Sequence, residues 1–137
     1  MVGVDIDRKE LTDLRKVVDH ALLASAANLP FIDNAFSLGF ILEIIEHLDP
    51  ETGRKCLKDM QRTCRKIIVS TPKDIKPCLI ESHKHQWTRK ELSVFGLKQY
   101  PHKNYLIFTN IWFPSRYRKL VSRIIPVAIK RMIKKWL

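Results

Sequence analysis

The sequence lacks any hydrophobic run long enough to cross a bilayer, and its N-terminus lacks the basic-then-apolar pattern of a signal peptide. We therefore expect a cytoplasmic protein. Its three cysteines are odd in number and form no Cys-x-x-Cys pair, which argues against a disulfide framework and predicts reduced thiols. A length of 137 residues, with 45% hydrophobic and 28% charged side chains, predicts one globular domain with a real core.

Acidic residues are missing from the last third of the chain. Residues 92–137 hold 10 lysines and arginines and no Asp or Glu, whereas residues 1–91 are almost neutral. Such a basic region attracts phosphate, either of nucleic acid or of an anionic membrane. Within residues 114–137, apolar side chains recur at helical spacing with basic ones opposite, which is typical of a helix lying in a membrane interface.

Two other interpretations of residues 114–137 remain open. One is an ordinary C-terminal helix packed on the sheet, with a solvated basic face. The other is an RNA-binding tail, which ranks lower because the segment lacks the motifs of RNA-binding modules. We therefore expect an anionic membrane surface as the partner of this segment before nucleic acid, with the protein peripheral to the inner face of the membrane. The oligomeric state is left open.

The hydrophobic pattern predicts the order strand, helix, strand, strand, helix, strand, helix and hairpin. Strands are expected at residues 2–6, 21–25, 36–42, 65–70, 97–100 and 105–112. Asp7 is expected to cap the first helix and Thr88 the last, each three residues before a glutamate. This order predicts an α/β fold whose sheet is mostly parallel and ends in an antiparallel C-terminal hairpin.

Four short motifs follow one another through the predicted sheet, at residues 2–7 (VGVDID), 29–36 (LPFIDNAF), 43–48 (EIIEHL) and 67–72 (IIVSTP). In this order and spacing they resemble the class I S-adenosylmethionine (SAM) dependent methyltransferases, in particular the methyltransferase type 11 group. The resemblance covers about residues 2–113 and implies a Rossmann-like sheet with SAM as cofactor. Residues 114–137 form a second, basic segment outside it.

The resemblance implies a set of cofactor-binding residues after the expected strands. Asp5 would accept hydrogen bonds from the ribose hydroxyls of SAM, and Ile6 would pack on its adenine. Ser25 stands where the family has an acidic residue that contacts the adenine amino group, and Ala26 occupies the small position after it. Leu42 would complete the cofactor site. The alternative for Asp5, that it merely starts the following helix, is outweighed by the motifs downstream.

The resemblance also implies a substrate pocket at the end of the strand 36–42. Glu43 and His47 would face the acceptor there, and His47 could act as a general base because imidazole is the side chain that ordinarily exchanges protons near neutral pH. A structural role for His47 is the commoner alternative. Trp87 is a candidate pocket wall or, equally, a core residue. The acceptor is expected to be small or lipid-linked, because the basic amphipathic segment suggests a membrane.

No metal site is expected. His83 and His85 lie near Cys78, but there is no second cysteine in the segment and no histidine pair at i,i+4 spacing. A solvated loop is therefore the better interpretation of residues 78–85.

The glycine-rich loop of the resembled family is missing. In that family, a strand ending in such a loop holds the methionine end of SAM and lies between the strands equivalent to residues 2–6 and 36–42. We therefore expect a fold truncated at its N-terminus, in which those strands either pair directly or leave a gap. Two hypotheses follow: a SAM-dependent methyltransferase, or a non-catalytic remnant of that fold that binds membrane or nucleic acid.

Overall fold

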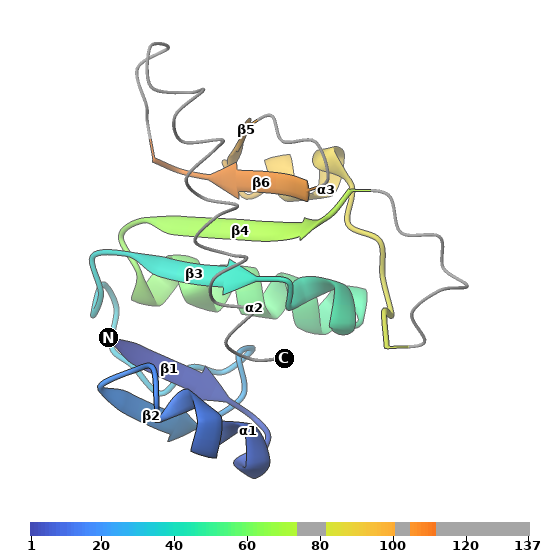
Figure 1. Ribbon diagram of the computed structural model, residues 1–137. Coiled ribbons are helices and arrows are strands. Elements are labelled where there is room, and N and C mark those ends of the chain that lie inside the picture. Colours follow the sequence, from blue (N-terminus) through green and yellow to red (C-terminus); the bar gives the residue numbers. More distant parts are fainter. Residues whose placement is uncertain (74–81, 101–104, 112–137) are drawn as a thin grey trace.

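The computed structural model describes residues 1–73, 82–100 and 105–111 (Figure 1). Its elements follow the predicted order of strands and helices. They are β1 (Val2–Asp5), α1 (Arg8–Leu14), β2 (His20–Leu23), β3 (Gly39–Leu42), the 3-10 helix η1 (Ile45–His47), α2 (Pro50–Thr63), β4 (Ile67–Pro72), α3 (Arg89–Ser93), β5 (Lys98–Tyr100) and β6 (Tyr105–Thr109). The basic segment 114–137 and Cys78 lie outside the described residues.

The strands form two separate sheets. β1 pairs with β2 in parallel, and β3, β4, β6 and β5 form a four-stranded sheet in that order. Within the larger sheet β3 and β4 are parallel, while β6 runs antiparallel to both β4 and β5. The predicted α/β fold, with parallel strands followed by an antiparallel C-terminal hairpin, is therefore confirmed.

The gap expected in the sheet lies between β1 and β3. Neither strand pairs with the other, and no described strand joins the two sheets (Figure 1). Of the two outcomes expected from the missing strand, direct pairing and a divided sheet, the structure has the second. Each of the two strands consequently has an edge without a ladder partner in the described part of the chain, and such edges are templates for pairing with another strand.

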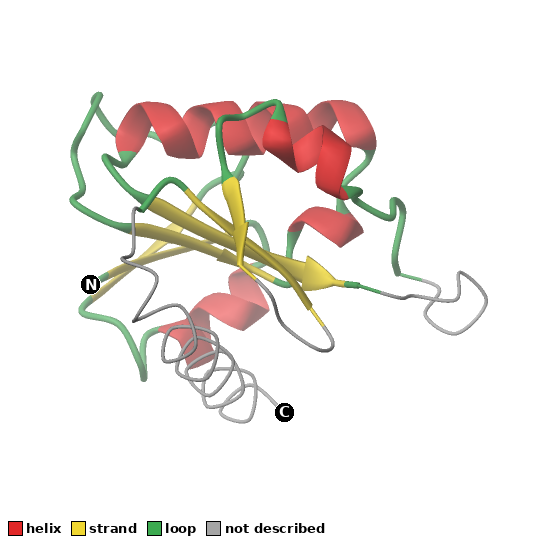
Figure 2. Cartoon of the chain, turned by 90° about the horizontal axis from the view of Figure 1, so that it is seen from above, coloured by secondary structure: helices red, strands yellow, loops and turns green. Residues whose placement is uncertain are grey.

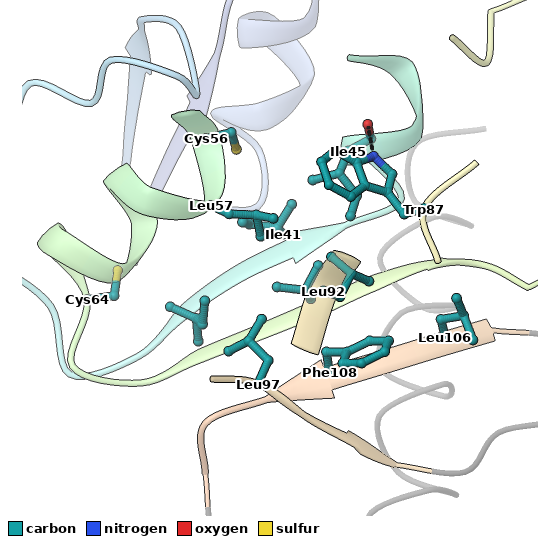
Figure 3. Close-up of a cluster of buried hydrophobic side chains, with 12 residues drawn as sticks. Ile41, Ile45, Cys56, Leu57, Cys64, Trp87, Leu92, Leu97, Leu106 and Phe108 are labelled. Atoms are coloured by element: carbon teal, nitrogen blue, oxygen red, sulfur yellow. Dashed lines mark hydrogen bonds between the residues drawn. The ribbon is translucent and has the colours of Figure 1, made fainter. Parts of the chain in front are cut away.

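The main core lies on one face of the four-stranded sheet, under α2 and α3. Alternate side chains of the strands point to it, as the two-residue period of a strand requires. Figure 2 shows α2 on one side of the strands and α1 on the other. The cluster consists of Ile41, Ile45, Cys56, Leu57, Cys64, Ile67, Val69, Trp87, Leu92, Leu97, Leu106 and Phe108 (Figure 3).

Local capping explains where the helices next to this core begin and end. The carboxylate of Asp49 accepts hydrogen bonds from the amides of Glu51 and Thr52 at 3.1 and 3.0 Å, so α2 begins at Pro50. At α3, Thr88 and Glu91 form the predicted capping box, in which each side chain binds the other's backbone amide. The last turn stops before Gly96, whose φ of +69° suits glycine.

Candidate functional site

Polar side chains gather where the parallel strands end. Asp5 ends β1, Ser25 follows β2, Glu43 follows β3, and Ser70 lies two residues before the end of β4. All four strands run in the same direction in Figure 1, so their carboxyl ends share one edge of the fold. Ligands of open α/β sheets bind outside this edge. The predicted site residues after the first three strands are therefore brought to the place where a ligand is expected, and Ser70 of β4 joins them there.

The residues predicted to contact adenosine lie around the ends of β1 and β2. Asp5 is partly exposed, and one of its carboxylate oxygens accepts the amide of Asp7 at 2.8 Å. The side chain of Ile6 is 75% exposed, so it is available to an apolar ligand face. The hydroxyl of Ser25 accepts the amide of Ala27 at 3.2 Å, and Ala26 packs against the main core.

The loop that carries the LPFID motif is held in place by α2. The guanidinium of Arg62 donates to the carbonyls of Leu29 and Phe31 at 3.0 and 2.7 Å and to the Asp33 carboxylate at 2.9 Å. It also donates to one carboxylate oxygen of Asp59 at 2.7 Å. The other oxygen of Asp59 accepts a hydrogen bond from the amide of Leu29. A planar guanidinium can satisfy several acceptors at once, so these bonds fix the path of the chain after β2.

Replacing Arg62 by lysine is expected to loosen this loop. Lysine keeps the positive charge but cannot reach two carbonyls and two carboxylates with one planar group. We expect R62K to lower the thermal unfolding midpoint, and R62A to lower it further, relative to R54A at an exposed position of the same helix. Circular dichroism melts of the three variants measure this. Equal midpoints for R62K and R54A would show that the loop does not depend on the guanidinium.

Glu43 occupies an unusual backbone conformation directly after β3. Its φ of 55° is rare for a residue with a side chain, and such strain gathers at functional sites. The carboxylate accepts a hydrogen bond from the Ser70 hydroxyl at 2.6 Å. Burial raises the pKa of Glu43 to about 7, and the nearby Glu46 carboxylate adds to this effect. Leu42, one residue earlier, packs with the cluster on the opposite face of the sheet from the main core.

Glu46, His47 and His83 form a second group beside Glu43. Each offers one nitrogen or oxygen atom, and these atoms lie within 4.8 Å of one another. The rings of His47 and His83 meet edge to face, with centroids 4.6 Å apart. Glu46 is only 1% exposed, and burial raises its pKa to about 7. Its Oε2 atom makes no hydrogen bond of standard geometry, although the Thr71 hydroxyl is near enough to oppose the rise in pKa slightly.

Trp87 is placed in the core and not at an open pocket wall. It is 1% exposed, packs beside Leu92, and donates from Nε1 to the carbonyl of Ile45 at 2.8 Å (Figure 3). This placement matches the alternative in which Trp87 is a core residue. Its hydrogen bond fixes η1, the turn that carries Glu46 and His47.

Glu46 and His83 are not among the site residues predicted from the sequence. Glu46 belongs to the EIIEHL motif, and His83 lies in the segment 78–85, for which a solvated loop was predicted. The useful signal was the spacing of Glu43 and Glu46–His47 at the end of a strand. The partner histidine lies 36 residues after His47, so its proximity depends on the fold.

Comparison with known proteins finds a family match in the N-terminal part of the chain. Residues 1–67 match a family model described as a methyltransferase domain. Over this stretch the chain is similar to that family. The resemblance seen in the sequence motifs is thereby confirmed. The methyltransferase match runs from β1 to the first residue of β4, and it includes every predicted site residue except Trp87. No curated protein matches the sequence significantly.

Solved structures show the same fold over most of the chain. The PH0226 protein from Pyrococcus horikoshii OT3 aligns with a TM-score of 0.62 at 13% identity, covering 80% of this chain and 69% of that one. The small RNA methyltransferase HEN1 aligns with a TM-score of 0.58 at 18% identity, covering 79% and 20%. The YcgJ protein from Bacillus subtilis gives 0.54 at 17%, covering 71% and 52%. The chain thus spans only part of each of these structures.

No helix in the described ranges combines the length and apolar character needed to cross a bilayer.

Proposed function

We propose that the chain acts as a SAM-dependent methyltransferase, with its cofactor across the carboxyl ends of β1, β2 and β3. The observation that carries this proposal is the methyltransferase family match over residues 1–67, which includes the polar and apolar residues at that edge. When bound, SAM supplies a methyl group on an electrophilic sulfonium. Positioning the acceptor against that methyl group is then the main task of the protein.

The residues at the edge suit the adenosine end of SAM. The Asp5 carboxylate has one oxygen on the Asp7 amide and retains further lone pairs for two ribose hydroxyls. Ile6 offers an exposed apolar face to adenine. The Ser25 hydroxyl can still donate its proton to a ring nitrogen, because in the fold it acts as an acceptor for the Ala27 amide.

For the methionine end of SAM, the described part of the chain offers no comparable set of residues. The four glycines lie within β1, at the start of β3, inside α2 and after α3, so none forms a glycine-rich turn at this edge. Such a turn would provide backbone amides and a helix N-terminus for a carboxylate. We therefore expect the 137-residue chain to hold SAM mainly through its adenosine end, with modest affinity.

Titration calorimetry of SAM into the purified chain tests the proposal. D5A removes a charged acceptor of two hydrogen bonds, each worth about 1.5–3 kcal/mol. We expect D5A to weaken binding at least about tenfold. D5N, which keeps the bond to the Asp7 amide, should bind between D5A and the wild type. The control is D13A, an exposed change on α1. A folded wild-type chain that binds no SAM, or D5A with unchanged affinity, would contradict the proposal.

The acceptor is proposed to be small or lipid-linked, as the basic amphipathic sequence at 114–137 suggests. A second candidate function is a non-catalytic module that docks on anionic membrane or nucleic acid. The observation that favours it is the divided sheet, which leaves β1 and β3 unpaired with each other. The SAM titration separates the two candidates, because a docking module has no need for the Asp5 carboxylate.

A further inference from the structure

Three side chains at the end of β3 have the composition of a metal-ligand set. Glu46 and His47 come from η1, and His83 comes from a segment far along the chain. Ligands on one ion lie at most about 4.2 Å apart, because each bonds at about 2.1 Å from the metal. The atoms offered here are within 4.8 Å of one another, so a small side-chain rotation is enough to close the set.

The hydrogen bond made by His47 leaves its other ring nitrogen, Nε2, available to bind a metal. The Nδ1 atom of His47 lies 3.2 Å from the carbonyl of Ser82. A carbonyl only accepts hydrogen bonds, so Nδ1 must carry the proton, and the lone pair is on Nε2. When one ring nitrogen of a histidine binds a metal, the other commonly donates a hydrogen bond to a backbone carbonyl.

Two other atoms of the group are buried without a hydrogen bond of standard geometry. They are Oε2 of Glu46, on a side chain that is 1% exposed and near the Thr71 hydroxyl, and Nδ1 of His83. A buried polar atom without a partner costs about 1–3 kcal/mol. A cation between them removes that cost for both atoms at once. This observation is independent of the clustering, and it points to a positively charged ligand.

The backbone holds the group together before any ligand arrives. The carbonyl of Glu46 accepts the amides of Lys84 and His85 at 2.8 and 3.2 Å, which fixes His83 beside η1. Trp87 binds the carbonyl of Ile45 at 2.8 Å, so η1 is tied to residues 82–87 along its length. Sites placed on such cross-linked backbone keep their geometry better than sites on free loops.

We propose that Glu46, His47 and His83 bind a divalent first-row transition-metal ion. Two imidazoles and one carboxylate suit Zn²⁺, Co²⁺ or Fe²⁺, and they leave positions open on the ion. Glu43, beside the group, is available as a further carboxylate. Because η1 directly follows β3, the group lies at the carboxyl end of that strand, and an oxygen of an acceptor bound there, such as a hydroxyl, would complete the shell. That last role rests on the proposed function, whereas metal binding itself does not.

Titration of Co²⁺ into the EDTA-treated and dialysed chain, followed by its visible absorption, tests the site. We expect saturation at one equivalent and displacement of the cobalt by Zn²⁺. H47A and H83A should each weaken binding about 10–100-fold. E46Q keeps the size of the buried side chain and should also weaken binding, which covers the case in which a histidine variant fails to fold. H20A, at an exposed histidine of β2, is the matched control and should bind as the wild type does.

C78S distinguishes this site from a loop site that uses Cys78 with His83 and His85. We expect C78S to leave the cobalt affinity unchanged. The proposal is overturned by loss of binding in C78S, by unchanged affinity in a folded H83A, or by a folded wild-type chain that takes up no cobalt. Since the cobalt titration contains no SAM, its failure is distinguishable from failure of the proposed methyltransferase function.

Discussion

Trp87→Ala is expected to lower the free energy of unfolding by about 3–5 kcal/mol, the usual cost of removing a buried tryptophan. The side chain is 1% exposed and packs with Ile45 and Leu92 between the sheet and its covering helices (Figure 3). Its loss also leaves the carbonyl of Ile45 without its Nε1 donor. Small domains are stable by only about 5–15 kcal/mol, so this variant should be close to unfolding at 25 °C. Urea denaturation followed by circular dichroism measures the loss.

W87F and V94A are the matched controls for this prediction. W87F keeps an aromatic ring but removes the hydrogen bond to Ile45, so it should lower the free energy of unfolding less than W87A does. V94A changes a side chain that is 80% exposed, and we expect it to stay within about 0.5 kcal/mol of the wild type. If W87A and V94A unfolded at the same urea concentration, Trp87 would not be part of the core in solution.

The fold could be predicted from the sequence wherever the signal was local. The caps at Asp7 and Thr88 and the β-branched run of β4 lie within a few residues of the elements they define. Strand ends were less exact: β3 was expected from Phe36 but begins at Gly39. Phe36 makes only an isolated bridge to Cys64, three residues before the ladder with β4 begins. Where a strand starts depends on its neighbour, which the pattern of a single strand does not contain.

The same difference between local and tertiary signals applies to the candidate site. The residues that end β1, β2 and β3 could be found from motifs, because each sits at a fixed offset from its strand. The group of Glu46, His47 and His83 could not, because His83 is held beside η1 by tertiary hydrogen bonds such as those of the Lys84 and His85 amides to the Glu46 carbonyl. The hydrogen bonds of Arg62 to the 29–33 loop could not be predicted either, because they join positions about 30 residues apart. Contacts of this kind follow from tertiary packing and have no signature in local spacing.

Gly53→Ala is expected to destabilise the protein by about 1–3 kcal/mol, the usual cost of overpacking a core. Helix propensity alone predicts the opposite sign, because alanine is about 1 kcal/mol better than glycine inside a helix. Here a Cβ atom at position 53 would lie 2.3 Å from Cζ2 of Trp87. The indole is rigid and buried, so it cannot rotate away without disturbing Ile45 and Leu92.

The sign of the change in the free energy of unfolding of G53A decides between overpacking and helix propensity. Urea denaturation measures this change. K58A, at an exposed position of α2, is the control for helix propensity and should change the stability little. The penalty of G53A should shrink in the W87F background, because the smaller ring does not extend as far as the indole. Such coupling is expected for residues in contact and absent for distant pairs. A stabilised G53A would mean that Trp87 moves aside freely, and the close approach of α2 to the tryptophan would then not constrain the position of η1.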